Sequence, residues 1–464
     1  MQVMTEKNKS KSEKKYMTTT KQILFGFLAA IIIGTLLLSL PIATVNGETD
    51  VLTALFTATT SICVTGLVVV NTFSYWSLFG KIVIICLIQL GGLGIVAFTS
   101  AVLLVFHKKV TLRSRMVIQD AFSLNNLQGM VRFVKKVIIG TLVVEFVGAL
   151  VYMIDFIPRY GVLKGIWFSV FNAISAFCNA GIDILGPDSL MSFNSSPLIL
   201  INTMFLISLG GIGFVVWWDV LDVVKRVMRK EIRAVDYFRN LRVHSKVVIT
   251  TTLSLILSGM LLTFVFEYNN PATIGSMSLE DKVLNSFFQS VTYRTAGFAT
   301  IDQAGLTDSS VFAGIVYMLI GGSPVGTAGG IKTVSFVVLL FAVVAVVKGR
   351  NETIMFNRSV REDIIRRSLA VAFISITVFF VFTIMLMISN DLGISDAAFE
   401  VGSAIATVGL TRNVTPTLNV FGKILIIIAM YLGRIGPISM FVAFSNKYSI
   451  KNSIHYADSD IIVG

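Results

Sequence analysis

The sequence of 464 residues is poor in charge: 14% of its residues are Asp, Glu, Lys or Arg, whereas 55% are hydrophobic. A mean hydropathy of +0.81 excludes an ordinary soluble domain, in which about 25% of residues are charged. Cysteine is equally scarce, and Cys63, Cys86 and Cys178 all lie in apolar segments, so a disulfide framework is not expected. The composition therefore fits a protein whose solvent is the lipid bilayer.

Eight stretches are long and apolar enough to cross a hydrocarbon core, which needs about 20 helical residues. They cover residues 22–42, 78–106, 134–157, 196–224, 246–267, 310–347, 368–390 and 420–446. An even number of crossings places both termini on the same side. The sequence thus predicts an all-α polytopic membrane protein.

The net charge of +12 is distributed unevenly between the loops. Lys and Arg crowd the N-terminal tail and the loops at 107–136, 225–246 and 348–367, whereas the opposite loops hold few. This positive-inside pattern predicts that both termini lie in the cytoplasm. It also explains the basic composition by topology, so no nucleic-acid partner is expected. The N-terminus has no small-residue cleavage site, and no signal peptide is predicted.

Four short segments between successive spans align with one another. They read ALFTATTSICVTGL from Ala54, SVFNAISAFCNAGI from Ser169, SFFQSVTYRTAGFA from Ser286 and AAFEVGSAIATVGL from Ala397. Their glycines, which recur at intervals of 115, 116 and 112 residues, are Gly66, Gly181, Gly297 and Gly409. About a dozen helical residues precede each glycine, roughly 18 Å, which is too short to cross. Each segment is therefore expected to enter the membrane and turn back.

A second motif recurs in the span after each glycine. It reads QLGGLGIV at Gln89, SLGGIGFV at Ser208, LIGGSPVGTAGGIKT at Leu319 and YLGRIGPIS at Tyr431. The chain thus predicts four pseudo-symmetric M1–pore helix–M2 repeats, all pointing the same way, around a single central pore. Their expected bounds are 22–110, 130–225, 244–348 and 367–447, between cytoplasmic tails at 1–21 and 448–464.

The glycine strands indicate a cation site. Irregular backbone at membrane depth is tolerated where it lines a watery cavity, and carbonyl oxygens can there replace the hydration shell of an alkali cation. Helix C-termini, each worth about −0.5 charge, aim at the same axis. One such glycine alone would suggest a helix C-cap, but four at one repeat position favour a filter. The expected filter residues are Val64, Thr65, Gly66, Asn179, Ala180, Gly181, Thr295, Ala296, Gly297, Thr407, Val408 and Gly409.

The third unit interrupts its second span with GGSPVGTAGG, from Gly321 to Gly330. A straight helix would lose about 1 kcal/mol per Gly and 3 per Pro there. We expect the helix to open into a loop within the membrane, just below the filter; a hinge without gating is the alternative. A phosphate-binding loop is disfavoured, because Ile331 separates the last glycine from Lys332.

Two arginines stand near the expected pore. Arg434 occupies the motif position that holds Gly92 and Gly211 in the first two units. A guanidinium at this depth needs a partner or a watery cavity. We expect Arg434 to form an electrostatic barrier and to donate to backbone carbonyls that the loop frees, a purely structural arginine being the alternative. Arg294 is expected to brace the third pore helix through carbonyl contacts.

The filter strands VTG, NAG, TAG and TVG between paired spans resemble those of the superfamily of Trk, Ktr and plant high-affinity potassium transporters. The resemblance covers nearly the whole chain, and eight spans are more similar to the Ktr membrane subunit than to Trk. In that superfamily glycine at all four positions goes with potassium selectivity, whereas serine at the first goes with sodium permeation in some plant members. Gly66 therefore implies potassium.

The resemblance implies potassium uptake across the bacterial cytoplasmic membrane, with K+ as the transported ion and no covalent cofactor. It implies a homodimer, surrounded by membrane lipids, on a cytosolic ring of KtrA-type RCK subunits that bind ATP or ADP; sodium stimulation occurs in the family. A sodium-permeable or Na+/K+ coupled transporter is the alternative, and an enzyme is disfavoured because the filter segments hold little beyond Glu400. The implied gate comprises Gly321, Gly322, Ser323, Pro324, Gly326, Thr327, Gly329, Gly330 and Arg434.

Overall fold

The computed structural model describes residues 19–94 and 130–436. The predicted tails at 1–21 and 448–464 fall wholly or mostly outside these ranges, as do the ends of repeats 1 and 4. Within them the regular secondary structure is helical except for a small antiparallel hairpin. Its strands, β1 (Ile354–Met355) and β2 (Arg358–Ser359), pair Ile354 with Ser359.

Four long helices each open one repeat: α1 (Thr19–Leu38), α7 (Met130–Tyr160), α12 (Val243–Glu267) and α16 (Glu362–Asn390). These helices are long and apolar enough to cross a membrane. Large apolar side chains on their outer surfaces are exposed, among them Ile33, Phe146, Leu257 and Phe373. Such exposure is costly in water but suits a helix that faces lipid.

Four short helices follow them: α2 (Val51–Cys63), α8 (Val162–Cys178), α13 (Leu279–Thr292) and α17 (Ile394–Ala406). Their 13 to 17 residues are too few to span the hydrocarbon core, as the sequence predicted. Polar caps start two of them, since the carboxylate of Asp50 accepts from Thr53 N and the hydroxyl of Ser278 from Asp281 N. The C-terminal turns of all four are buried.

The second span of each repeat begins with a helix that ends at the recurring glycine motif. These helices are α4 (Leu78–Leu93), α9 (Pro197–Ile212), α14 (Asp308–Leu319) and α18 (Val420–Ile435). The span expected at 196–224 consists of two helices, because α9 continues into α10 (Phe214–Met228) through a bend of 99°.

A glycine with positive φ causes this break. Gly94, Gly213 and Gly436 occupy one motif position and have φ of +82°, +93° and +87°, a conformation that residues with a Cβ avoid. The third unit has Pro324 at this position and opens into the expected loop before α15 (Thr333–Val347). The second unit therefore shares the break predicted for the third unit alone, and the expected spans at 78–106 and 420–446 extend beyond the described residues.

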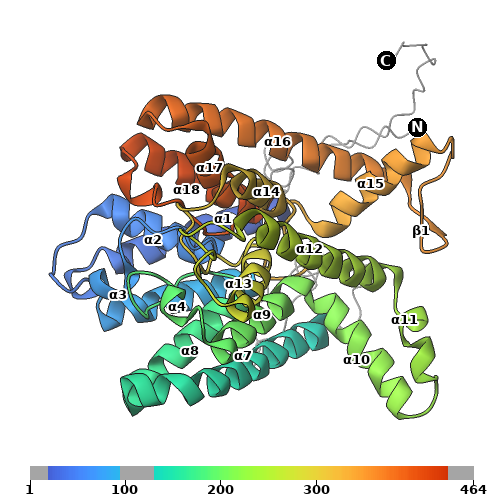
Figure 1. Ribbon diagram of the computed structural model, residues 1–464, viewed down its shortest axis with the longest axis horizontal. Coiled ribbons are helices and arrows are strands. Elements are labelled where there is room, and N and C mark those ends of the chain that lie inside the picture. The colour runs from blue at the N-terminus through green and yellow to red at the C-terminus, as the bar shows by residue number, and fades with distance from the viewer. Residues whose placement is uncertain (1–18, 95–129, 437–464) are drawn as a thin grey trace, which may run out of the picture.

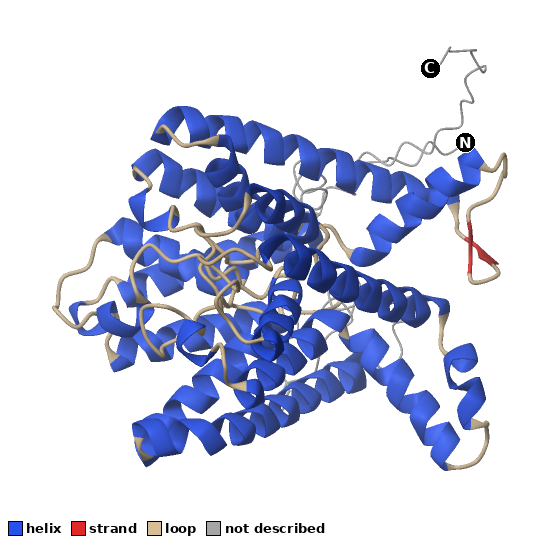
Figure 2. Cartoon of the chain, in the orientation of Figure 1, coloured by secondary structure: helices blue, strands red, loops and turns tan. Residues whose placement is uncertain are grey.

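The four repeats close into one ring. Each second-span helix packs against the pore helix of the following repeat, and the last returns to the first: α4 against α8, α9 against α13, α14 against α17, and α18 against α2. In Figure 1 the repeats follow one another around the centre in chain order. Figure 2 shows loops gathered at that centre, enclosed by helices. The ring therefore surrounds an axis that loop backbone lines.

The remaining elements lie outside the ring. Helix α10, the short α11 (Tyr237–Asn240) and the β-hairpin lie on one side of the view in Figure 1. The short α3 (Thr72–Tyr75) lies on the opposite side. Helix α15 packs against α12 of its own repeat and against α16 of the fourth repeat.

Candidate functional site

Each pore helix is followed by a left-handed residue. In three repeats this residue is the C-cap of the helix, whereas in the third it lies two positions after the C-cap. The residue two positions before each glycine is left-handed: φ is +56° at Val64, +60° at Asn179, +64° at Thr295 and +53° at Thr407. A left-handed residue with a Cβ costs about 1–2 kcal/mol. Four equivalent cases in one chain show that the surrounding structure holds this turn, as it does at many functional sites. The turn converts each helix into an extended strand.

The four filter glycines form a closed ring of contacts. A Cβ added to Gly66 would lie 2.6 Å from Ala180 O, one on Gly181 would lie 2.6 Å from Ala296 O, and one on Gly297 would lie 2.5 Å from Val408 O. A Cβ on Gly409 would strike Thr65 O and close the cycle. Each glycine thus faces the carbonyl oxygen that precedes the glycine of the next repeat. Only a residue without a side chain permits this approach.

Hydroxyl groups of the pore helices hold the strands from behind. Gly66 N donates to Thr60 Oγ1 and Gly409 N donates to Ser403 Oγ, each at 3.0 Å. Ser175 Oγ donates to Ile182 O at 2.5 Å. This support of the filter by hydroxyl groups was not predicted, although Thr60, Ser175 and Ser403 each lie six residues before a filter glycine.

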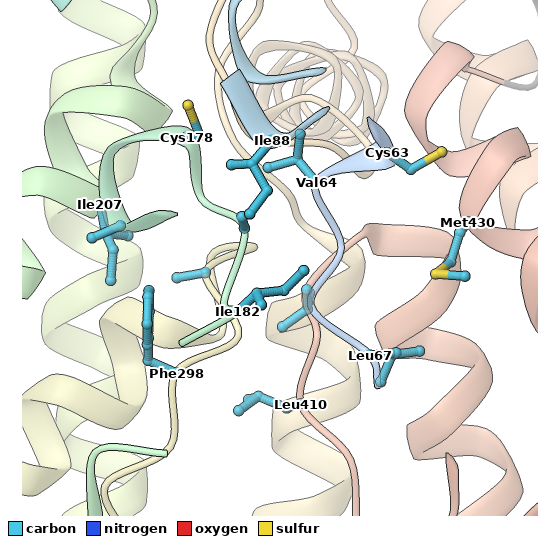
Figure 3. Packing of buried hydrophobic residues seen from close by; sticks show 14 of the residues in the cluster. Cys63, Val64, Leu67, Ile88, Cys178, Ile182, Ile207, Phe298, Leu410 and Met430 are labelled. Carbon is cyan, nitrogen blue, oxygen red and sulfur yellow. The ribbon is translucent and has the colours of Figure 1, made fainter. Parts of the chain in front are cut away.

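An apolar side chain follows each filter glycine and anchors the strand in the core. These residues, at most 2% exposed, are Leu67, Ile182, Phe298 and Leu410. In Figure 3, Leu67 points toward Met430 of α18, and Phe298 lies near Ile207 of α9. Burial of such side chains stabilises each strand by about 1.5–3 kcal/mol. The filter backbone is therefore fixed by both polar and apolar contacts.

A cavity of about 620 Å³ opens beside all four filter glycines. Asp183, Asp188 and Asp302 line it, and no lysine or arginine does so among the described residues. Burial raises the pKa of Asp183 to about 6, although hydrogen bonds from Leu185 N and Ser189 oppose the rise. The negative charge of this cavity, called the acidic mouth below, attracts cations. These aspartates were not predicted, because their only signal in the sequence is that Asp183 and Asp302 closely follow filter glycines.

On the other side of the filter, the Gly321–Gly330 loop docks on the second repeat. Ser323 N donates to Gly211 O at 3.0 Å, and Thr327 N donates to Gly210 O at 3.1 Å. In return, Phe214 N donates to Val325 O at 3.0 Å. The backbone groups left free at the break of the second repeat and in the loop of the third thus form hydrogen bonds with each other. This pairing explains how irregular backbone is tolerated at this depth.

The loop also contacts the filter strands directly. The Thr327 hydroxyl contacts Phe177 O at 3.2 Å and Asn179 Oδ1 at 2.9 Å. A Cβ on Gly329 would strike Thr407 Oγ1 and lie 3.1 Å from Ala406 O. The loop thus lies against the strands of the second and fourth repeats, on the side away from the acidic mouth.

Arg434 links this loop to a third repeat. Its guanidinium donates to Thr327 O in the loop and to Gly91 O, at the break of the first repeat. The hydrogen bond that the sequence predicted with a loop carbonyl is present. Lys332 Nζ donates to Ala328 O at 2.7 Å, so two cationic side chains hold the loop.

A buried carboxylate lies halfway along α7 and was missed from the sequence. Glu145 is 5% exposed, and Gln89 Nε2 lies 3.1 and 3.3 Å from its two carboxylate oxygens. Gln89 belongs to the glycine motif of the first repeat, two residues before Gly91. Glu145 could have been predicted from the sequence, because an acidic residue in the middle of an apolar span marks a functional position.

Two further ionisable side chains near the filter are buried. The Arg294 guanidinium contacts Thr252 Oγ1 at 3.5 Å, and its Nη1 has no partner among the described residues. With the described residues, the Arg294 guanidinium therefore makes none of the carbonyl contacts expected to brace the third pore helix. Glu400 accepts hydrogen bonds from the hydroxyls of Thr411 and Thr415, which follow the fourth strand.

A ring of four re-entrant glycine strands, an acidic mouth and a loop within the membrane together define a multi-pass transporter of cations. Comparison with known proteins agrees, because residues 2–456 match the TrkH family, described as cation transport proteins. The chain belongs to this family and is a transporter, not an enzyme.

Individual relatives match along almost their whole length. The Ktr system potassium uptake protein B of Bacillus subtilis is 38% identical over 98% of this chain and 99% of its own. The potassium/sodium uptake protein NtpJ of Enterococcus hirae is 34% identical over 98% and 99%. The crystal structure of the potassium transporter TrkH from Vibrio parahaemolyticus has a TM-score of 0.72 at 15% identity, covering 94% of this chain and 86% of that one. It shares the fold of four helix, pore helix, helix repeats.

Proposed function

We propose that this protein takes up potassium ions through the ring of four glycine strands. The observation that carries the proposal is the cyclic contact of each filter glycine with a carbonyl oxygen of the next repeat. Carbonyl oxygens so arranged replace the hydration shell of K+. The name of the Bacillus subtilis relative supports potassium as the ion. The ion-binding backbone is that of the strands Val64–Gly66, Asn179–Gly181, Thr295–Gly297 and Thr407–Gly409.

The distribution of basic residues supports a direction of transport. We assign both termini, α10 and the β-hairpin to the cytoplasm, because Lys and Arg are concentrated in their loops. The acidic mouth then faces outward and collects cations before they enter the filter. An inside-negative potential supplies about 2.3 kcal/mol per charge per 100 mV, which drives uptake without further coupling.

The Gly321–Gly330 loop is assigned as the gate. It lies against two filter strands, and Arg434 places a positive charge beside the path of the ion. Opening requires that the bonds of Thr327 and Arg434 break, after which the loop can leave the axis. The gating residues are the eight loop positions expected from the sequence together with Arg434.

A Ktr relative further supports assembly with other subunits. The proposed assembly is a homodimer on a cytosolic ring of KtrA-type RCK subunits that bind ATP or ADP. Its docking faces are the basic segments at 226–242 and 348–367, which include α11 and the β-hairpin.

A sodium-permeable or Na+/K+ coupled transporter is the second candidate. The name of the Enterococcus hirae relative includes sodium. In addition, Glu145 supplies the carboxylate in the middle of a span that a coupled mechanism would use. Stimulation of potassium uptake by sodium belongs to the same candidate.

The test is growth of bacteria that lack potassium uptake, at low potassium, with a KtrA-type partner supplied. The wild-type chain is expected to restore growth, and Gly66→Ser to lose selectivity for K+ over Na+, because a side chain at Gly66 meets Ala180 O. Gly393→Ser is the matched control, since a Cβ at Gly393 meets nothing within 4 Å. No rescue by the wild-type chain, or unchanged selectivity in Gly66→Ser, contradicts the proposal.

A further inference from the structure

A second cavity lies beside the loop, between the third and fourth repeats. Its volume is about 440 Å³, the size of a small-molecule pocket. Three basic side chains line it, Lys332, Arg367 and Arg434, and no acidic residue does so in the described part of the chain. The other walls are mostly apolar and include Leu319, Val371, Val378, Ile405 and Leu432.

No carboxylate among the described residues compensates the positive charge of this cavity. Lys332 and Arg434 donate to backbone carbonyls, but neither they nor Arg367 pair with a carboxylate within residues 19–94 and 130–436. Like charges that share a poorly solvated cavity repel each other, and unpaired charges there are costly. An anion in the cavity would offset both effects.

The N-terminus of α15 adds to this field. Ser335, in the first turn of α15, lines the cavity, and the helix begins at Thr333, directly after Lys332. A helix N-terminus carries about +0.5 charge and favours phosphate groups. The cavity thus combines three basic side chains with a helix end, which is the chemistry that binds phosphate.

The walls indicate where the rest of such a ligand would lie. The cavity is bounded by α15 and α16, which pack against each other. Both helices carry exposed apolar side chains, including Val343, Val347, Phe373 and Phe380. A ligand with a phosphate group and hydrocarbon chains matches this combination, since its chains can follow the apolar surfaces of the two helices.

We propose that this cavity binds a phosphate-bearing anion, the headgroup of an anionic phospholipid whose acyl chains lie along α15 and α16. The headgroup contacts Lys332 from the third repeat and Arg434 from the fourth, together with Arg367. Because Lys332 and Arg434 also hold the loop, the lipid composition of the membrane acts on the loop through this site.

Binding is tested on the purified full-length protein by native mass spectrometry, so the result does not depend on ion transport. The protein is titrated with phosphatidylglycerol, with phosphatidylcholine of the same acyl chains, and with inorganic phosphate. Phosphatidylglycerol is expected to bind more tightly than phosphatidylcholine. Arg367→Gln is expected to weaken phosphatidylglycerol binding about fivefold and to leave phosphatidylcholine binding unchanged.

The matched control is Arg366→Gln. Arg366 is the neighbouring residue, pairs with Glu362 at 2.7 Å and does not line the cavity, so its replacement leaves lipid binding unchanged. Equal affinities for the two lipids, or equal effects of the two variants, overturn the proposal. Displacement of bound lipid by inorganic phosphate at lower concentration confirms the phosphate site but overturns the lipid as its source.

Discussion

The guanidinium of Arg434 donates to the carbonyl of Thr327, so a side chain of the fourth repeat holds the loop of the third beneath the filter. The same guanidinium donates to Gly91 O of the first repeat, and the Thr327 hydroxyl contacts the second. All four repeats therefore meet at the loop, and the closed arrangement depends on a few hydrogen bonds.

Arg434→Ala is expected to increase potassium flux about tenfold to a hundredfold. The substitution removes hydrogen bonds from a charged group, each worth about 1.5–3 kcal/mol, together with a positive charge near the ion path. Flux into potassium-loaded vesicles, measured at a fixed membrane potential, checks the prediction. An unchanged rate would show that Arg434 has a purely structural function.

Thr327→Val is expected to increase flux by a smaller factor, up to about tenfold. Valine keeps the shape of the side chain but loses the contacts with Phe177 O and Asn179 Oδ1, and a neutral hydrogen bond contributes about 0.5–1.5 kcal/mol. Thr377→Val on α16 serves as the control, because the Thr377 hydroxyl bonds only within its own helix. Equal rates in the two variants would contradict a gating function of Thr327.

Potassium uptake at limiting concentration is expected to fall as the external pH drops from 7 to 5. Burial raises the pKa of Asp183 to about 6, so this carboxyl is charged above that pH and neutral below it. The mouth then keeps Asp188 and Asp302 but loses one negative charge. Asp183→Asn should lower uptake at pH 7 and flatten this part of the profile. If the profile of Asp183→Asn matches that of the exposed-site control Asp391→Asn, Asp183 is not the titrating group.

Glu145→Ala is expected to destabilise the protein by about 1–3 kcal/mol, because it leaves the half-buried amide of Gln89 without its acceptor. Glu145→Gln keeps one acceptor oxygen and should cost less. Thermal unfolding in detergent measures both, with the exposed Glu352→Ala as the control. A Tm of Glu145→Ala equal to that of the control would show that the Gln89 contact does not stabilise the fold.

Much of the fold follows from the sequence, since four segments with glycines at a nearly constant period can be recognised by alignment alone. The pore helices are also predictable, because about a dozen helical residues cannot cross the bilayer. What periodicity could not show is the bend at Gly213, since the apolar pattern runs through it without interruption. The φ of +93° at Gly213 becomes visible only in three dimensions.

The candidate site was predictable in part. The four filter glycines and the Gly321–Gly330 loop can be recognised as sequence motifs. Arg434 can also be recognised, because charged residues are rare in these spans. The acidic mouth was not predictable, because Asp183 and Asp302 belong to different repeats and meet only when the ring closes. The contact between Gln89 and Glu145 was not predictable either, because the two residues are 56 positions apart in sequence and lie on different helices.

The most direct test of the central claim is the ratio of K+ to Na+ flux in vesicles that contain the purified protein. We expect a clear preference for K+ in the wild-type chain, preserved in Gly393→Ser and lost or strongly reduced in Gly66→Ser. The same ratio in all three proteins would contradict it, because the glycine ring could then not be the filter.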